Sequence, residues 1–102
     1  MRVKHSVSNN SLYIYFCGEL DECTAVKTRD IIDKIIDDYS YVKNVIFDLK
    51  MLTFMDSTGI GMLIGRYKKI KAKKLSAYIQ NPSVLAERIL EISGLYKIMP
   101  KI

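Results

Sequence analysis

The chain has 102 residues, of which 49% are hydrophobic and 26% charged, with a formal net charge of +5. This length and balance are typical of one small globular domain, so we expect a single domain over residues 1–102. No apolar run approaches the roughly 20 residues of a membrane span and the first residues have no signal-peptide core, which predicts a cytoplasmic protein without a membrane anchor.

The N-terminal residues predict a β-hairpin. Val3–Val7 alternates in polarity, and the next four residues, Ser8–Ser11, have turn chemistry. Leu12–Cys17 is rich in aromatic and branched side chains, which favours a strand that ends at Gly18. Cys17 and Cys23 lack metal-type spacing, so we expect reduced thiols and no metal site.

The middle of the chain predicts two helices around a buried strand. Apolar residues recur at helical spacing from Ala25 to Tyr39, after Asp21 or Thr24 as a helix cap. Val45–Leu49 is mostly apolar and is expected to form a buried strand. A second amphipathic helix is expected to begin at Ser57, with its inner face formed by Ile60, Leu63, Ile64, Tyr67 and Ile70.

The C-terminal part predicts a strand, a helix and a last short strand. Leu75–Ile79 alternates, and Asn81-Pro82 has the residues of a helix start. Gly94 is expected to end that helix, and Lys97–Met99 is expected to form the short strand. The predicted inner face of the helix consists of Leu85, Ile89 and Ile92.

The element order ββαβαβα, with a final β, predicts an α/β domain. Strands that alternate with helices favour one small mixed sheet, here of about four to five strands, that carries the helices. The links between elements are short, which leaves no room for a linker or second domain.

Charge is unevenly distributed along the chain. Acidic residues dominate Glu19–Asp38, and basic residues crowd Arg66–Lys74. The basic residues point around much of a helix and have no aromatic residues interleaved for base stacking. We therefore expect a solvated helix end, where cations also suit the helix dipole, and no direct contact with nucleic acid.

Asp56–Gly61 carries the most informative motif. Ser57 lies at a strand-to-helix junction, where a hydroxyl acts as a helix cap, a nucleophile or a phosphorylation switch. A nucleophile needs a base, but His5 is the only histidine, and Met55 breaks the Gly-x-Ser-x-Gly pattern, so we predict no enzyme. The glycines of the motif also lack the lysine of a phosphate-binding loop. The cap and the switch both remain open.

The surroundings of Ser57 suggest a surface for a partner. The turn after Gly18 is expected to bring Asp21 to the edge of the sheet where Ser57 lies. Met55 and Met62 fall outside the inner stripe of the second helix, where they either line an adaptable contact surface or fill gaps in the core.

Motif-like segments recur along nearly the whole chain: Gly18–Asp21 with Thr24-Ala25, Phe47–Leu49, Phe54–Gly61, Gly65–Lys68, Asn81-Pro82 and Gly94-Leu95. Together they resemble the signature of the STAS domain, and most closely that of the anti-sigma F factor antagonists of its sporulation branch. Glu22 and Cys23 stand where the sporulation branch often has two histidines, and Thr58 stands where serine is common.

The resemblance implies a regulator of transcription that acts through protein contacts. Members bind an anti-sigma factor, itself a serine kinase, and thereby release a sigma factor. The kinase uses ATP to phosphorylate the serine that matches Ser57, which inactivates the antagonist, and a PP2C-type phosphatase restores it. No cofactor is implied. Asp21 and Asp56 match acidic positions of the family beside that serine. With the residues around the motif, the expected partner-binding residues are Asp21, Met55, Asp56, Thr58, Gly59, Gly61 and Met62. Other branches remain alternatives: a general stress regulator or the soluble subunit of a lipid transporter.

Overall fold

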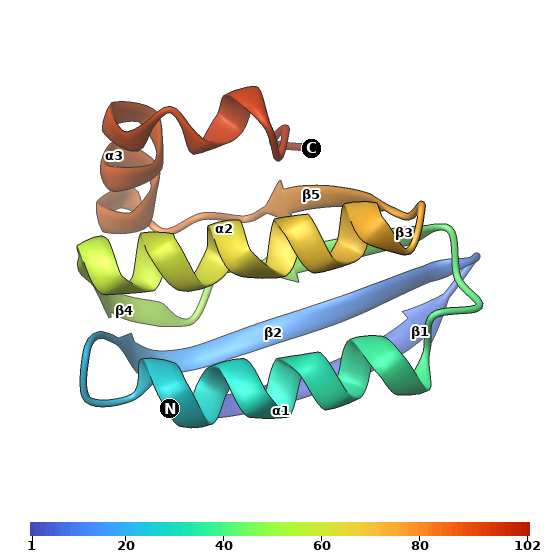
Figure 1. Ribbon diagram of the computed structural model, residues 1–102. Coiled ribbons are helices and arrows are strands. Elements are labelled where there is room, and N and C mark those ends of the chain that lie inside the picture. Colours follow the sequence, from blue (N-terminus) through green and yellow to red (C-terminus); the bar gives the residue numbers. More distant parts are fainter.

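Five strands and three α-helices follow one another in the order ββαββαβα, in a computed structural model that describes all residues 1–102 (Figure 1). The predicted α/β class with a mixed sheet is confirmed, with an additional short strand that the pattern did not reveal. The elements are β1 (Arg2–Ser8), β2 (Ser11–Leu20), α1 (Ala25–Asp38), β3 (Asn44–Asp48), β4 (Leu52–Met55), α2 (Ser57–Ala72), β5 (Ser76–Gln80), α3 (Val84–Ser93) and the 3₁₀ helix η1 (Leu95–Lys97).

The sheet has the strand order β1-β2-β3-β5, with β4 also pairing β2. β1 is antiparallel to β2, whereas β3, β4 and β5 are paired in parallel. The predicted end of β2 at Gly18 is wrong. Gly18 has a φ of 116° and the register shifts between it and Glu19, so this glycine bends the strand, which continues to Leu20. The continuation pairs with β4 beyond the end of β3.

The N-terminal hairpin forms as predicted. Asn9 and Asn10 have φ values of 51° and 63°, so both central residues of the two-residue turn are left-handed. This is the geometry that matches the twist of a β-hairpin, and asparagine tolerates it better than most residues.

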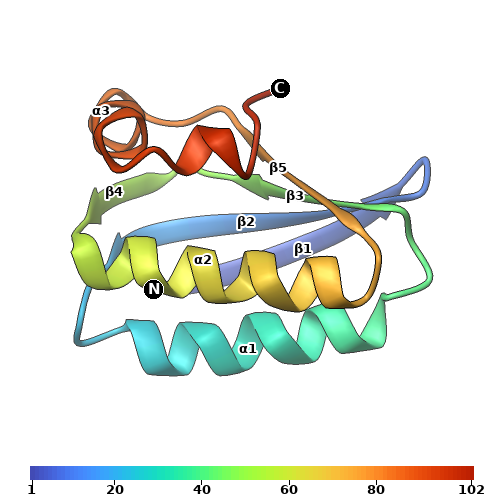
Figure 2. The same cartoon turned by 45° about the horizontal axis from the view of Figure 1, so that its top comes forward.

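The helices cover the two sides of the sheet unequally. α1 and α2 lie side by side on one face, whereas α3 and η1 lie on the other side near β4 and β5 (Figure 2). Leu12, Ile14 and Phe16 alternate along β2 and are fully buried. They belong to one core cluster with apolar residues of all three α-helices. In α1, the predicted inner face is confirmed.

Ion pairs join α1 to α2. Arg66 Nε lies 2.8 Å from Asp33 Oδ1, and Lys69 Nζ and Lys73 Nζ each lie 3.0 Å from Asp37 Oδ1. The basic run is therefore only partly the solvated helix end that the sequence predicts. Half of its cations face the acidic helix, because the two helices run side by side.

The C-terminal part differs from the prediction in its details. Ser83, rather than Asn81, caps α3 by accepting a hydrogen bond from the Ala86 N–H at 3.2 Å. The buried face of α3 is formed by Ala86 and Leu90, which lie four residues apart on one side of the helix, whereas Leu85 and Ile92 are exposed. The small side chain of Ala86 allows this side of the helix to approach the core. Gly94 ends the helix in the left-handed conformation, as predicted.

The last residues form no strand at Lys97–Met99: Lys97 ends η1, and Ile98 and Met99 follow in a turn. Further on, the chain runs along the outer edge of β5. Ile79 N–H donates to the Pro100 carbonyl at 3.0 Å, and Ile102 N–H donates to the Ile79 carbonyl at 2.9 Å. This segment therefore covers part of the edge of β5.

Candidate functional site

Two parallel strands end side by side and bring the predicted site residues together. Leu20 of β2 is paired with Met55 of β4, and the Asp56 N–H lies 3.4 Å from the Leu20 carbonyl oxygen. Asp21 and Asp56 are the next residues of the two strands. They share the same rim of the sheet, as the sequence predicts.

Asp56, rather than Ser57, caps α2. Asp56 has an extended backbone, and its Oδ1 accepts a hydrogen bond from the Gly59 N–H at 3.1 Å. Ser57 is the first helical residue, so the predicted helix start is right and the predicted cap is wrong by one position. The Ser57 side chain is exposed, and no hydrogen bond within the chain engages its hydroxyl. The hydroxyl is therefore free for chemistry.

Asp21 organises the turn that leads into α1. Its Oδ1 accepts hydrogen bonds from the N–H groups of Cys23 and Thr24, at 2.9 and 3.1 Å. The Thr24 hydroxyl donates to the Glu19 carbonyl at 2.9 Å. Thr24 occupies the cap position of α1 but makes no side-chain cap hydrogen bond. The Asp21 side chain thus rigidifies its own turn at the rim.

The two glycines of the motif have different environments. A Cβ atom on Gly59 would lie 2.8 Å from Met55 Cγ and 2.9 Å from the Leu20 carbonyl oxygen. Gly59 is buried, and its lack of a side chain allows α2 to pack closely against β2 and β4. The expectation that it lies at the surface and contacts a partner directly does not fit this burial. Gly61 is exposed and has open space where its Cβ would be.

Met55 and Met62 belong to the core. Only 2% of Met55 and 7% of Met62 are exposed, and both side chains pack in the main cluster. The expectation that they lie outside the inner face is wrong for two reasons. Met55 is the last residue of β4 and is buried with that strand, whereas Met62 is buried because α2 packs against both the sheet and α1 and so buries a wider stripe. Each methionine still forms part of the wall of a surface hollow.

Two hollows flank the first turns of α2. The first, which we call the apolar hollow, has a volume of about 330 Å³ and lies between α2 and α3. Its walls are formed by Met55, Asp56, Ser57, Ile60, Ile89, Ile92 and Ser93.

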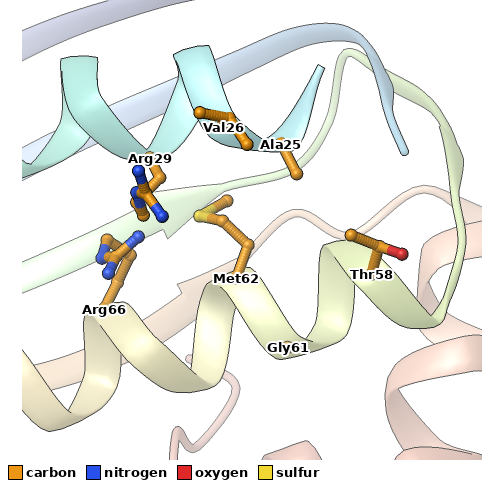
Figure 3. A pocket seen from close by; sticks show the side chains of 7 residues that line it. All are labelled: Ala25, Val26, Arg29, Thr58, Gly61, Met62 and Arg66. Carbon is orange, nitrogen blue, oxygen red and sulfur yellow. The ribbon is translucent and has the colours of Figure 1, made fainter. Parts of the chain in front are cut away.

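The second, which we call the arginine hollow, has a volume of about 260 Å³ and lies between α1 and α2 (Figure 3). Its walls are formed by Ala25, Val26, Arg29, Thr58, Gly61, Met62 and Arg66.

The sequence pattern does not reveal that Ile92 lies at the surface, nor that Arg29 and Arg66 lie close together. Ile89 packs partly buried against the core, in line with its predicted place on the inner face, and also lines the apolar hollow. One available signal was that Arg66 is the only arginine in a run of lysines, since arginine is the cation more suited to burial.

The only histidine lies away from Ser57. His5 Nε2 lies 3.3 Å from the hydroxyl of Tyr39, which follows the C-terminal end of α1, whereas the rim lies at the N-terminal end of that helix. No three His, Cys, Asp or Glu side chains are gathered in a way that would hold a metal ion. None of the helices has both the length and the apolar character to cross a bilayer.

The mixed sheet, the helices on its two sides and the rim at the start of α2 are features of the STAS domain. The model of the STAS domain family matches residues 2–102, so the chain belongs to this family.

Similar proteins refine this assignment. An anti-sigma F factor antagonist of Paenibacillus polymyxa is 40% identical over 91 residues, which cover 87% of this chain and 75% of that protein. An anti-sigma-B factor antagonist of Listeria monocytogenes is 28% identical over 88 residues, which cover 84% and 74%.

The fold is shared with the anti-sigma factor antagonist SpoIIAA. Its unphosphorylated form has a TM-score of 0.79 at 26% identity, covering 99% of this chain and 88% of that chain. The phosphorylated form of SpoIIAA from Bacillus has a TM-score of 0.71 at 27% identity, covering 99% and 91%.

Proposed function

We propose that this chain is an anti-sigma factor antagonist that is switched off by phosphorylation of Ser57. In this proposal it acts in the cytoplasm, binds an anti-sigma factor with serine kinase activity and so releases a sporulation sigma factor. The observation that carries the proposal is the exposed, unbonded Ser57 hydroxyl at the edge of the apolar hollow.

Ser57 suits the role of a phosphate acceptor. Because Asp56 caps the helix, the serine hydroxyl is not needed for the stability of α2. A phosphate at the first helical position lies beside the positive end of the helix dipole, so the domain stays folded. The kinase brings ATP, and the chain itself needs no cofactor or catalytic base. A PP2C-type phosphatase then restores the free hydroxyl.

The surroundings of Ser57 explain why phosphorylation would prevent binding. The apolar hollow is walled largely by isoleucine side chains, which favour an apolar group of the partner. A phosphate adds about −1.5 to −2 charges beside the Asp56 carboxylate. Burying that charge under a partner without a cation to compensate it is costly.

The identity levels favour the sporulation branch. The anti-sigma F factor antagonist of Paenibacillus polymyxa is 40% identical to this chain, against 28% for the anti-sigma-B factor antagonist of Listeria monocytogenes. The general stress branch is thus the second candidate, and no observation favours the lipid-transporter subunit.

The test uses the anti-sigma F factor of Paenibacillus polymyxa as the kinase, with ATP. We expect one phosphate per chain, mapped to Ser57 by mass spectrometry. Ser57→Ala should remove it, whereas the matched control Thr58→Val should keep it. Phosphate on Thr58, or none on either residue, would refute the switch.

Binding gives the second half of the test. Ser57→Asp should weaken binding to the anti-sigma F factor by about 100-fold or more, since it places a charge at the edge of the apolar hollow. Its melting temperature should match that of the wild type. Unchanged binding by Ser57→Asp would contradict the proposed function.

A further inference from the structure

Two nitrogens of the Arg66 guanidinium group, Nε and Nη1, are buried without a hydrogen-bond partner. Only 10% of its side chain is exposed. Its Nε lies 2.8 Å from Asp33 Oδ1, but the contact lacks hydrogen-bond alignment, because neither atom has a hydrogen-bond partner. Nη1 is also buried without an acceptor. Unsatisfied buried donors are rare in proteins, so this group calls for an explanation.

Arg29 of α1 lies on the opposite side of the same hollow. The two arginine side chains reach toward each other from the two helices (Figure 3). Burial lowers the pKa of Arg66, the Asp33 charge raises it, and the Arg29 charge lowers it further, so the two guanidinium groups influence one another. Arg29 is held by Asp30, at 3.1 Å from Nη2 to Oδ1.

The charges of the arginine hollow favour a carboxylate as the missing acceptor. Two carboxylates, those of Asp30 and Asp33, already balance the two guanidinium groups. The hollow therefore has no excess positive charge for a phosphate with two or more charges or for a nucleic acid. What it lacks is an acceptor, and the fork of an arginine matches the two oxygens of one carboxylate.

The arginine hollow extends to the first turn of α2, beside the site of the proposed switch. Thr58 lines it, and Gly61, which also lines it, is exposed and has open space where its Cβ would be. Because Thr58 follows Ser57 on the first turn of α2, a kinase that reaches Ser57 also lies close to this hollow. A volume of about 260 Å³ accommodates an acidic side chain.

We propose that the arginine hollow binds an Asp or Glu side chain of the anti-sigma factor, whose carboxylate pairs with Arg66 and Arg29. This inference rests on the proposed function and identifies a second contact of the same complex. It assigns to Arg66 a role in recognition in addition to its contact with Asp33.

The test measures binding of the anti-sigma F factor of Paenibacillus polymyxa by calorimetry, without nucleotide. Arg29→Gln and Arg66→Lys should each weaken binding by about tenfold or more, since each removes part of a shielded charge pair. Lysine keeps the charge beside Asp33 but lacks the fork. Arg88→Gln is the matched control, because Arg88 is exposed on α3 and lines neither hollow.

A double-mutant cycle identifies the acidic residue. Each exposed Asp and Glu of the anti-sigma factor is changed to its amide and measured against wild type and Arg66→Lys. We expect one carboxylate whose loss weakens binding to the wild type but not further to Arg66→Lys. If every acidic residue acts independently of Arg66, the proposal is wrong.

Two further outcomes would overturn the inference without touching the proposed function. In the first, Arg29→Gln and Arg66→Lys bind the anti-sigma factor with affinities within about twofold of that of Arg88→Gln, while Ser57→Asp still abolishes binding. A change of that size is typical of an exposed charge. The other is a loss that appears only with ATP, which would identify a nucleotide phosphate as the ligand. Failure of the wild-type chain itself to bind would instead refute the proposed function.

Discussion

The two hollows beside α2 differ in chemistry although consecutive residues of the same helical turn line them. Ser57 lines the apolar hollow and Thr58 lines the arginine hollow. A negative charge on Ser57 meets isoleucine side chains, whereas one on Thr58 meets a wall that includes two arginines. Of the two adjacent hydroxyls, only that of Ser57 lies where an added charge would disturb apolar contact.

The two hollows would also contribute differently to the binding of a partner, one mainly to its affinity and the other mainly to its orientation. An apolar hollow gains free energy in proportion to the area that it buries, without strong directional preference. A guanidinium pair requires a carboxylate at a defined position. In the proposed complex, a partner that contacts both hollows is held tightly and in one orientation over Ser57.

The largest effect is expected from a charge placed in the apolar hollow. Ile92→Glu should weaken binding to the anti-sigma F factor by about 30-fold or more, because a carboxylate is buried without a partner. Ile92 is 81% exposed, so the fold should tolerate the change.

The matched control is Val84→Glu, since Val84 is 89% exposed on the same helix and lines neither hollow. Equal loss with both variants would mean that the charge of α3, rather than the hollow, matters to the partner.

A Cβ atom on Gly59 should disturb both hollows at once. Gly59→Ala places a methyl group against Met55 and the Leu20 carbonyl, so α2 must shift. We expect a loss of about 1–3 kcal/mol in the free energy of unfolding, measured by urea denaturation. A gain in stability would show that Met55 and the backbone at Leu20 move apart at little cost and that close packing at Gly59 is not required.

Gly61→Ala distinguishes the two hollows, because it changes the wall of the arginine hollow and leaves the apolar hollow unchanged. Both Gly61 and Gly65 are helical glycines with open space around them, so alanine at either should stabilise α2 by about 0.5–1 kcal/mol. Only Gly61 lines the hollow. Binding should therefore fall slightly with Gly61→Ala and stay constant with Gly65→Ala. A fall with both would extend the partner surface along α2.

The smallest effect concerns the ion pairs that hold the walls of the arginine hollow together. Hydrogen bonds from Lys69 and then Lys73 lower the pKa of Asp37 from its ordinary value of 3.8. The stability from ionised Asp37 is therefore present above about pH 4 and is lost as pH falls through the lowered pKa.

Asp37→Asn should lower the melting temperature slightly near pH 7 and have no effect in strong acid. A difference from wild type that is independent of pH would show that the ion pairs do not contribute.

The sequence predicted the elements with strong periodicity and missed those that depend on tertiary contact. The long helix from Ala25 and the hairpin at Asn9 follow from local chemistry. β4 has only four residues, and its identity as a strand comes from pairing with the bent end of β2.

The sequence predicted which residues lie at the rim, but not the hollows that form between neighbouring helices. The position of Ser57 at the start of α2 and its rim shared with Asp21 follow from the order of the elements. The cap was misassigned, because Asp56 and Ser57 have similar cap propensities and only backbone geometry separates them. The hollows require knowledge of which helices are neighbours, which no local pattern contains.

The segment that runs along β5 has a consequence for self-association. An uncovered edge strand offers its backbone N–H and C=O groups to other molecules, and this is a common origin of aggregation. Here Pro100 and Ile102 occupy the hydrogen-bonding groups of Ile79 at that edge. Pro100 and Ile102, which are exposed and add little to the core, thus hinder pairing of this edge with the sheet of another molecule.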